Sequence, residues 1–170
     1  MSLLEIVKYP DPILHKVSLP VDRFNDSLQT LVHNMLETMY AAPGVGLAAN
    51  QIGLDQRIFV IDVSHSEGEK VPLTFINPEM VSSEGEVTWE EGCLSLPEFV
   101  LQTFRKAHVT VRAMDEKGQK KITKADGLLA VAIQHELDHI NGILLVDKVG
   151  GLKRRLYRDK FKKKKIVTAL

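Results

Sequence analysis

The sequence predicts an α+β fold in which antiparallel β-sheets pack around a buried central helix, with one helix before the sheets and another at the C-terminal end. Three observations predict it: a helical repeat of apolar residues over 25–41, short β-type runs between 57 and 123, and a segment over 126–141 with two apolar stripes. This order of elements is typical of one α+β domain, and 170 residues fit one domain.

The first helix is predicted over 25–41, where apolar residues recur three and four positions apart. Asn25 or Asp26 can cap its start, and Pro43 with Gly44 ends it. Before it, Pro10 and Pro12 predict a turn and one short helical turn over 13–16.

Antiparallel strands are predicted from four short runs rich in β-forming residues, separated by turn signals. The runs are RIFVIDV from Arg57, PLTFI from Pro72, EVTW from Glu86 and HVTVRAM from His108. Residues 120–123 are expected to return as a partner strand after the turn at Lys117 and Gly118.

The central helix is predicted from Asp126, an N-cap, to Asn141 and Gly142, which can end it. One of its stripes carries Leu128, Val131, Ala132, His135 and His139, and the other carries Leu129, Ile133, Leu137 and Ile140. Two apolar stripes predict a helix that is buried on most sides. A last helix is expected over 151–167.

Charge divides the chain into an acidic body and a basic end. Residues 1–150 hold 13 basic and 21 acidic residues, whereas residues 151–170 hold 9 basic residues and one acid. We therefore expect a single catalytic domain over 1–150 and a basic helix and tail over 151–170 attached to it.

Composition excludes several classes of protein. With 44% hydrophobic and 26% charged residues, the chain is not expected to be disordered, and its apolar runs are far shorter than the ~20 residues of a membrane span. A single cysteine allows no internal disulfide, and the N-terminus resembles no signal peptide. We therefore expect a cytoplasmic protein that does not enter a membrane.

Residues 135–139 form an H-E-x-x-H pattern within the central helix. Positions i and i+4 lie one above the other on a helix, so His135 and His139 can both face one ion. Glu136 is placed to handle a proton of a water bound to that ion. Two imidazoles and a carboxylate on an apolar helix would otherwise be desolvated without a partner, so the pattern predicts a metal site.

A catalytic metal ion needs a third protein ligand and an open position for water. Two candidates, Asp147 and Asp159, follow the two histidines. Cys93, the single cysteine, precedes them in a loop expected between Gly92 and Pro97. A thiolate suits a divalent cation, but lone cysteines are more often buried and inert, so the residues alone leave the choice open.

Three segments are similar to the three signature motifs of peptide deformylases, in the same order. They are GVGLAANQ from Gly44, EGCLS from Glu91 and QHELDH from Gln134. The resemblance implies a hydrolase that removes the N-formyl group from the N-terminal methionine of nascent proteins and releases formate. It implies Cys93, His135 and His139 as ligands of Fe2+, with Zn2+, Ni2+ or Co2+ as substitutes in purified protein.

In the mechanism that the resemblance implies, metal-bound water attacks the formyl carbon and Glu136 is the general base and acid. Donors to the developing oxyanion would be the backbone N–H of Leu94 and the side-chain amide of Gln51. Glu91 and Arg105 match an ion pair that supports the site. Two alternatives stay open for Asp138, which either orients a ligand or faces a basic neighbour.

An apolar pocket for the methionine side chain is predicted one and two turns before His135. The residues expected to line it are Leu128, Val131 and Ala132 on the helix, with Val45, Gly46 and Trp89 from other segments. One departure from the family pattern is Val100, because many bacterial members carry Arg at this position near the substrate entrance. How the entrance handles residues beyond methionine is therefore open.

The basic end suggests electrostatic contact with an acidic polymer, with ribosomal RNA as the expected partner over 153–165 and no sequence-specific DNA binding. Two other functions stay open from the residues. A small endopeptidase would share the metal and the base but leave Cys93 and the loop over 44–51 unexplained. A non-enzymatic RNA- or ribosome-binding protein with a structural metal would leave Glu136 unexplained.

Overall fold

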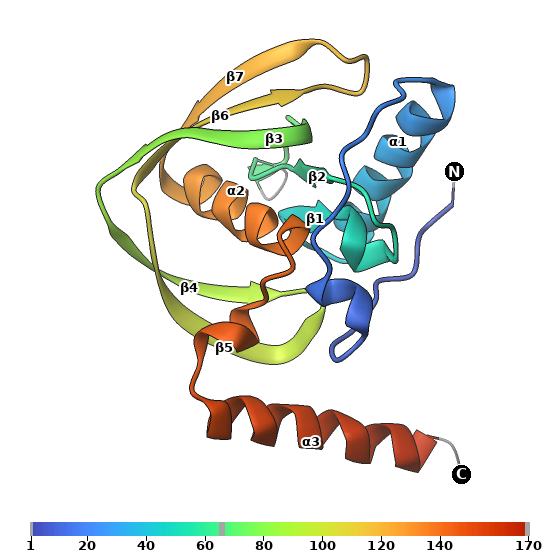
Figure 1. Ribbon diagram of the computed structural model, residues 1–170, viewed down its shortest axis with the longest axis vertical. Helices are drawn as coiled ribbons and strands as arrows, with labels where there is room; N and C mark the ends of the chain where they lie inside the picture. Colours follow the sequence, from blue (N-terminus) through green and yellow to red (C-terminus); the bar gives the residue numbers. More distant parts are fainter. Residues whose placement is uncertain (1, 65–66, 169–170) are drawn as a thin grey trace.

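The computed structural model describes residues 2–64 and 67–168, and of residues 162–168 it describes the backbone alone. Helix α2 (Gly127–Ile140) lies between a five-stranded sheet and a two-stranded hairpin (Figure 1). This arrangement confirms the predicted α+β class with antiparallel sheets. The strands are β1 (Gly46–Ala48), β2 (Ile58–Ile61), β3 (Leu73–Glu84), β4 (Val87–Cys93), β5 (Leu96–Arg105), β6 (His108–Met114) and β7 (Lys120–Ala125).

The larger sheet has the order β1-β2-β3-β6-β7, and each neighbouring pair is antiparallel. Strand β2 is buried on both faces because its side chains alternate between two helices. Phe59 and Ile61 belong to the core cluster that α2 shares, and Ile58 and Val60 belong to the cluster that α1 (Asp26–Ala41) shares. The sheet edge at β1 and β2 is therefore fixed between both helices.

Helix α1 begins as predicted, since the Asn25 side chain accepts a hydrogen bond from the Leu28 backbone N–H at 3.1 Å. Asp126 also occupies the N-cap position of α2, but its side chain makes no capping hydrogen bond. The short helical turn before α1 is present as η1 (Pro12–His15).

Strands β4 and β5 form the hairpin on the other side of α2, and here the expectations were partly wrong. The run from Glu86 was predicted as a four-residue strand, whereas β4 continues to Cys93, which pairs with Leu96 of β5. Cys93 therefore ends a strand instead of lying in a loop. Strand β5 and the short edge strand β1 were not predicted.

Helix α3 (Gly151–Thr168) packs against β5 through aromatic side chains. The Tyr157 hydroxyl donates to the Pro97 carbonyl at 2.9 Å, and the ring of Tyr157 meets that of Phe99 edge to face at 4.9 Å between centroids. α3 follows η4 (Leu145–Lys148) after a short connection. Within the described ranges, no helix combines the length and the apolar character needed to cross a membrane.

Candidate active site

Cys93, His135 and His139 converge where the end of β4 meets α2. The Nε2 atoms of the two histidines, one helical turn apart, are 3.1 Å from each other, and the Cys93 Sγ is 3.2 Å from the His139 Nε2. Their ligand atoms all lie within 4.8 Å of one another. The structure thus brings Cys93 to the histidines, while the Asp147 carboxylate instead contacts His15 at 3.1 Å.

The donor set fits a divalent transition-metal ion. One thiolate and two imidazoles are three protein ligands, which leaves a position free for a water or substrate oxygen. The His135 Nδ1 is 2.9 Å from the Glu91 Oε1, so this nitrogen carries the proton and the Nε2 lone pair faces Cys93 and His139. The His139 Nε2 lies 3.1 Å from the His135 Nε2, so both nitrogens can bind one shared cation.

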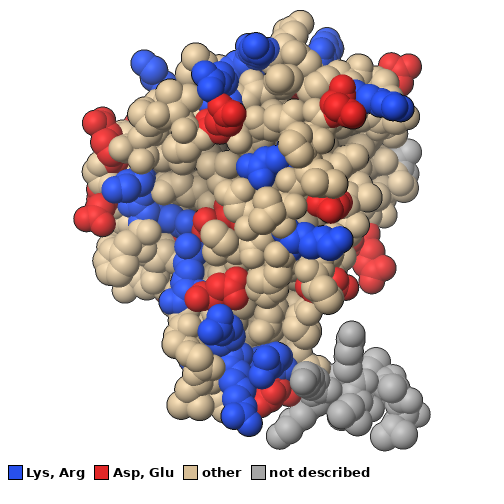
Figure 2. Space-filling model, in the orientation of Figure 1, with Lys and Arg blue, Asp and Glu red and all other residues tan. Residues whose placement is uncertain are grey.

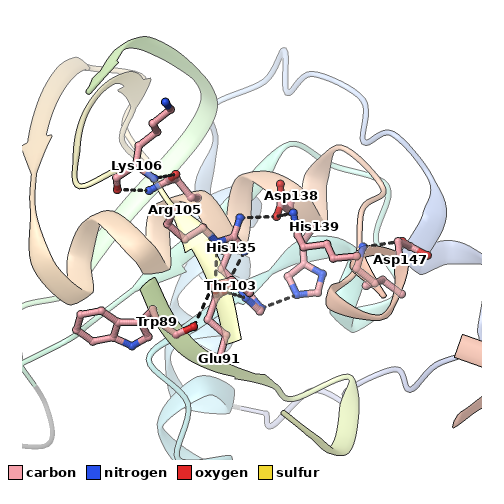
Figure 3. Close-up of polar contacts among 12 residues, drawn as sticks. Trp89, Glu91, Thr103, Arg105, Lys106, His135, Asp138, His139 and Asp147 are labelled. Carbon is pink, nitrogen blue, oxygen red and sulfur yellow. Dashed lines mark hydrogen bonds and ion pairs between the residues drawn. The ribbon is translucent and has the colours of Figure 1, made fainter. Parts of the chain in front are cut away.

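Glu91 and Arg105 form a buried ion pair behind His135 (Figure 3). The Arg105 Nε and Nη2 donate to the two carboxylate oxygens at 2.8 and 2.9 Å, and the Thr103 hydroxyl donates to Oε2. Burial alone would raise the pKa of Glu91, but the hydrogen bonds from His135, Arg105 and Thr103 outweigh it and lower the pKa to about 2. Glu91 is therefore a charged acceptor.

Asp138 faces basic neighbours, which was one of the two alternatives that the sequence left for it. Its Oδ2 accepts from the Arg105 Nη1 at 2.7 Å and lies 3.1 Å from the Lys148 Nζ. The carboxylate contacts no histidine of the cluster among the described hydrogen bonds.

Glu136 is buried beside the cluster, with 4% of its surface exposed, and its Oε2 has no hydrogen-bond partner among the described residues. Burial raises the pKa of this carboxyl group to about 7. The group packs against the backbone of Gly46, where an added Cβ would collide with the Oε1 and lie 2.9 Å from the Cδ. An unpartnered carboxyl group of this kind is suited to proton transfer.

A cavity of about 450 Å³ opens beside Cys93, His135 and Glu136. All six residues predicted for the methionine pocket line it: Val45, Gly46, Trp89, Leu128, Val131 and Ala132. Val100 also lines the cavity and is 55% exposed, so it lies at the entrance. Leu96 and Phe99 of the unpredicted strand β5 add an apolar wall that the sequence analysis missed.

Gln51 and Leu94 also line this cavity. The Gln51 side chain lies in η2 (Ala49–Ile52), where its Oε1 accepts from the Ala48 backbone N–H at 2.9 Å. Its Nε2 is 3.6 Å from the Cys93 Sγ and 3.2 Å from the Ser95 Oγ. The amide thus lies directly beside the ligand cluster.

Two buried polar residues at the site were not singled out from the sequence, although both lie in or beside the motifs that carry the resemblance. Ser95 holds the Gln51 amide, and Asn50 donates from its Nδ2 to the His139 carbonyl at 2.5 Å. Each links the motif around Gln51 to a ligand-bearing element. Asn50 lies within the motif GVGLAANQ and Ser95 within EGCLS, and this position is the sequence signal by which both could have been found.

Comparison with known proteins gives matches over nearly the whole chain. Residues 3–155 match the polypeptide deformylase family model. A peptide deformylase of Thermodesulfovibrio yellowstonii is 50% identical over 97% of this chain and 100% of its own length, and one of Rhizobium meliloti is 45% identical over 96% and 94%.

Solved structures of peptide deformylases superpose over almost the whole chain. That from Legionella pneumophila has a TM-score of 0.89 at 45% identity and covers 99% of this chain and 98% of its own. That from Ehrlichia chaffeensis in complex with actinonin has a TM-score of 0.90 at 39% identity, covering 96% and 98%. The chain therefore belongs to the polypeptide deformylase family, metal-dependent hydrolases that remove the N-formyl group from nascent peptides.

Proposed function

We propose that this chain performs the deformylase reaction with one divalent cation held by Cys93, His135 and His139. The single observation that carries the proposal is the convergence of these three side chains beside a cavity that Glu136 also lines. Such a cation would lower the pKa of a water in its coordination sphere to about 7 and would polarise a carbonyl oxygen.

Fe2+ is the proposed natural ion, as the family resemblance implies, and Zn2+, Ni2+ or Co2+ would take the same ligands in purified protein. The thiolate and imidazole donors accept all four ions, so the ligand set alone does not choose among them. Metal analysis of protein purified without oxygen tests the choice. We expect about one iron per chain, and zinc alone under these conditions would contradict iron.

Glu136 would move the proton of the reaction. Its unpartnered carboxyl group takes the proton of the attacking water and delivers it to the amine that leaves, so one group acts as base and then as acid. Burial of this group and its place on the cavity wall support the role.

The Gln51 side-chain amide and the Leu94 backbone N–H would donate to the oxygen of the formyl group as negative charge develops on it. Fixation of the Gln51 Oε1 by the Ala48 backbone supports this, because it leaves the Nε2 directed toward the ligand cluster. Removal of one such donor typically raises the activation barrier by about 2.7–4 kcal/mol.

Methionine would bind with its side chain against Leu128, Val131 and Ala132 of α2, opposite Val45, Gly46 and Trp89. Strands β1 and β4 are both edge strands, and both line the cavity, so their free backbone groups can pair with an extended peptide. A formyl carbon carries only hydrogen, so a tight site excludes larger acyl groups. Comparable turnover of formyl- and acetyl-methionyl peptides would contradict this fit.

Glu91 and Arg105 would support the site by orienting His135. The Glu91 carboxylate holds the His135 Nδ1 proton and Arg105 holds the carboxylate, as their distances of 2.9 and 2.8 Å support.

Formate release from a formyl-methionyl peptide, assayed beside cleavage of internal peptide bonds, tests the function as a whole. We expect formate and an otherwise intact peptide. Internal cleavage without formate would instead identify an endopeptidase that shares the metal and the base.

The basic helix over 151–170 would contact ribosomal RNA, and residues 1–150 would form the catalytic domain of a cytoplasmic enzyme. Figure 2 shows cationic side chains gathered over α3 at the lower end of the molecule. Those of Lys153, Arg154 and Arg158 are exposed, while the side chains of Lys162–Lys165 lie outside the described part. Deletion of residues 153–170 should abolish co-sedimentation with ribosomes at low salt. Unchanged co-sedimentation would contradict the contact.

A further inference from the structure

We infer that Asp138 and Lys148 are positioning residues for the metal site, acting through Arg105 and Glu91 on His135. The inference rests on the proposed function, since it takes His135 as a metal ligand. It extends the proposed Glu91–Arg105 support outward to the surface and gives both outer residues a role.

The contacts form a closed ring that starts and ends on α2 (Figure 3). His135 of α2 contacts Glu91 of β4 at 2.9 Å, and Glu91 holds Arg105 of β5 at 2.8 and 2.9 Å. The third guanidinium nitrogen of Arg105, Nη1, returns to Asp138 of α2 at 2.7 Å. The ring therefore ties the β4–β5 hairpin to the helix.

This tie matters because the proposed ligands come from the two elements that it joins. Cys93 ends β4, whereas His135 and His139 belong to α2. A metal site of fixed geometry needs the hairpin and the helix held in one relative position before the ion binds. The ring supplies that constraint two residues from Cys93, at Glu91.

Asp138 fixes the plane of Arg105. The Arg105 side chain is only 6% exposed, and its Nε and Nη2 are used by Glu91. A guanidinium group is planar, so a partner on Nη1 sets how the plane is turned and thereby where the Glu91 carboxylate lies. Asp138 is the described acceptor of the Nη1.

Lys148 holds Asp138 in place. Its Nζ lies 3.1 Å from the same Oδ2 that Arg105 uses, and Lys148 belongs to η4, outside both α2 and the β4–β5 hairpin. With Lys148 included, the charges are balanced: the two carboxylates, Glu91 and Asp138, face two cations, Arg105 and Lys148. Without it the ring carries one excess negative charge, and the Asp138 carboxylate, whose side chain is 22% exposed, is free to turn toward water.

The test measures how fast zinc-loaded protein loses its metal to a chelator with a coloured zinc complex. We expect Asp138→Asn to release zinc about 10-fold faster, as is usual when the partners of a ligand are disturbed, and Lys148→Met about 3-fold faster. Lys148→Arg keeps the ion pair and should behave as the unchanged protein. The thermal midpoint of the metal-loaded Lys148 variants should stay unchanged.

Lys121→Met is the matched control, because Lys121 also pairs with a carboxylate, that of Asp115 at 3.0 Å, but in the β6–β7 turn outside the ring. It should release zinc at the rate of the unchanged protein. Equal release from Lys148→Met and the unchanged protein would overturn the inference.

His135→Ala separates failure of the inference from failure of the proposed function. It should bind zinc far more weakly than any other variant. If His135→Ala loses its zinc but Lys148→Met and Asp138→Asn release theirs at the normal rate, only the positioning role is contradicted. If His135→Ala also releases its zinc at the normal rate, the assignment of His135 as a ligand is contradicted, and the inference is contradicted with it.

Discussion

Gly46 leaves the space that the Glu136 carboxyl group occupies. An added Cβ would collide with the Oε1 and would also lie 2.9 Å from the Cδ and 3.0 Å from the Cγ. Neither the helix that carries Glu136 nor the strand that begins at Gly46 can retreat easily, because both pack into the core. The absence of a side chain at residue 46 is therefore a requirement of the site.

Gly46→Ala is expected to lower kcat/KM by about 100-fold, because a shift of roughly 1 Å in a reacting group costs this much. Formate release by the purified variant measures it. The control is Gly150→Ala, where an added Cβ meets nothing within 4 Å and the backbone is not left-handed. A Gly46→Ala variant as active as this control would show that Glu136 does not need its present position.

Glu136→Gln should keep the fold and the metal while kcat falls by about 10²–10⁴-fold, since the amide occupies the same space but cannot take a proton. Metal content, thermal midpoint and formate release are measured on one preparation. Activity within a few fold of the unchanged protein would mean that another group moves the proton.

Among the elements, helix α2 was the most predictable. Its two apolar stripes and its two histidines four residues apart are visible in the sequence, and helical geometry alone places their side chains on one face. Strand β1 was missed because its residues, GLA, have little intrinsic preference for a strand, and pairing with β2 imposes the conformation.

Strand β5 was missed for a different reason. Pro97 stands at its second position and was taken to end the segment, and buried residues along β5 do not alternate strictly. The segment forms a strand because its backbone pairs with that of β4, and the local sequence pattern does not predict this pairing. The place of Cys93 at the end of a strand depends on that pairing, so the sequence could not supply it.

Tyr157→Phe tests how α3 is attached to β5. The variant loses the hydrogen bond to the Pro97 carbonyl and keeps the ring packing, so unfolding free energy should fall by about 1 kcal/mol in a urea titration. Lys160→Met removes an exposed ion pair to Glu98, with side chains 54% and 59% exposed, and should change stability by less. Equal stability of Tyr157→Phe and the unchanged protein would show that the hydrogen bond adds nothing.

Over the whole molecule, the site joins segments far apart in the chain. Gln51 comes from η2, Cys93 from the end of β4 and the histidines from α2, and contacts such as that of Asn50 with the His139 carbonyl hold the segments together. Chemistry and spacing within one helix predicted the histidine pair. The sequence left the third ligand open. Only the fold brings Cys93 beside His139, because no local pattern encodes a contact between residues 46 positions apart.

Stability of the whole domain should fall in acid, and Asp115 provides a direct test. Burial would raise the pKa of this carboxyl group, but the Gln119 N–H, the Lys121 ammonium and the Lys117 N–H lower it instead. The unfolded chain, with its pKa of about 3.9, then binds more protons than the folded chain, so stability rises with pH. The contribution is complete above the unfolded pKa and is lost as pH falls through the lower folded pKa.

Asp115→Asn should therefore lower the unfolding free energy at pH 7 by about 1–3 kcal/mol, the usual range for hydrogen bonds to a charged group, and the difference should shrink toward pH 2. Urea titrations at a series of pH values measure it. Glu86→Gln is the control, because Glu86 is exposed and makes no described ion pair. A difference between Asp115→Asn and the unchanged protein that stays constant from pH 7 to pH 2 would show that the charge of Asp115 is not what stabilises the β6–β7 turn, since protonation would then change nothing.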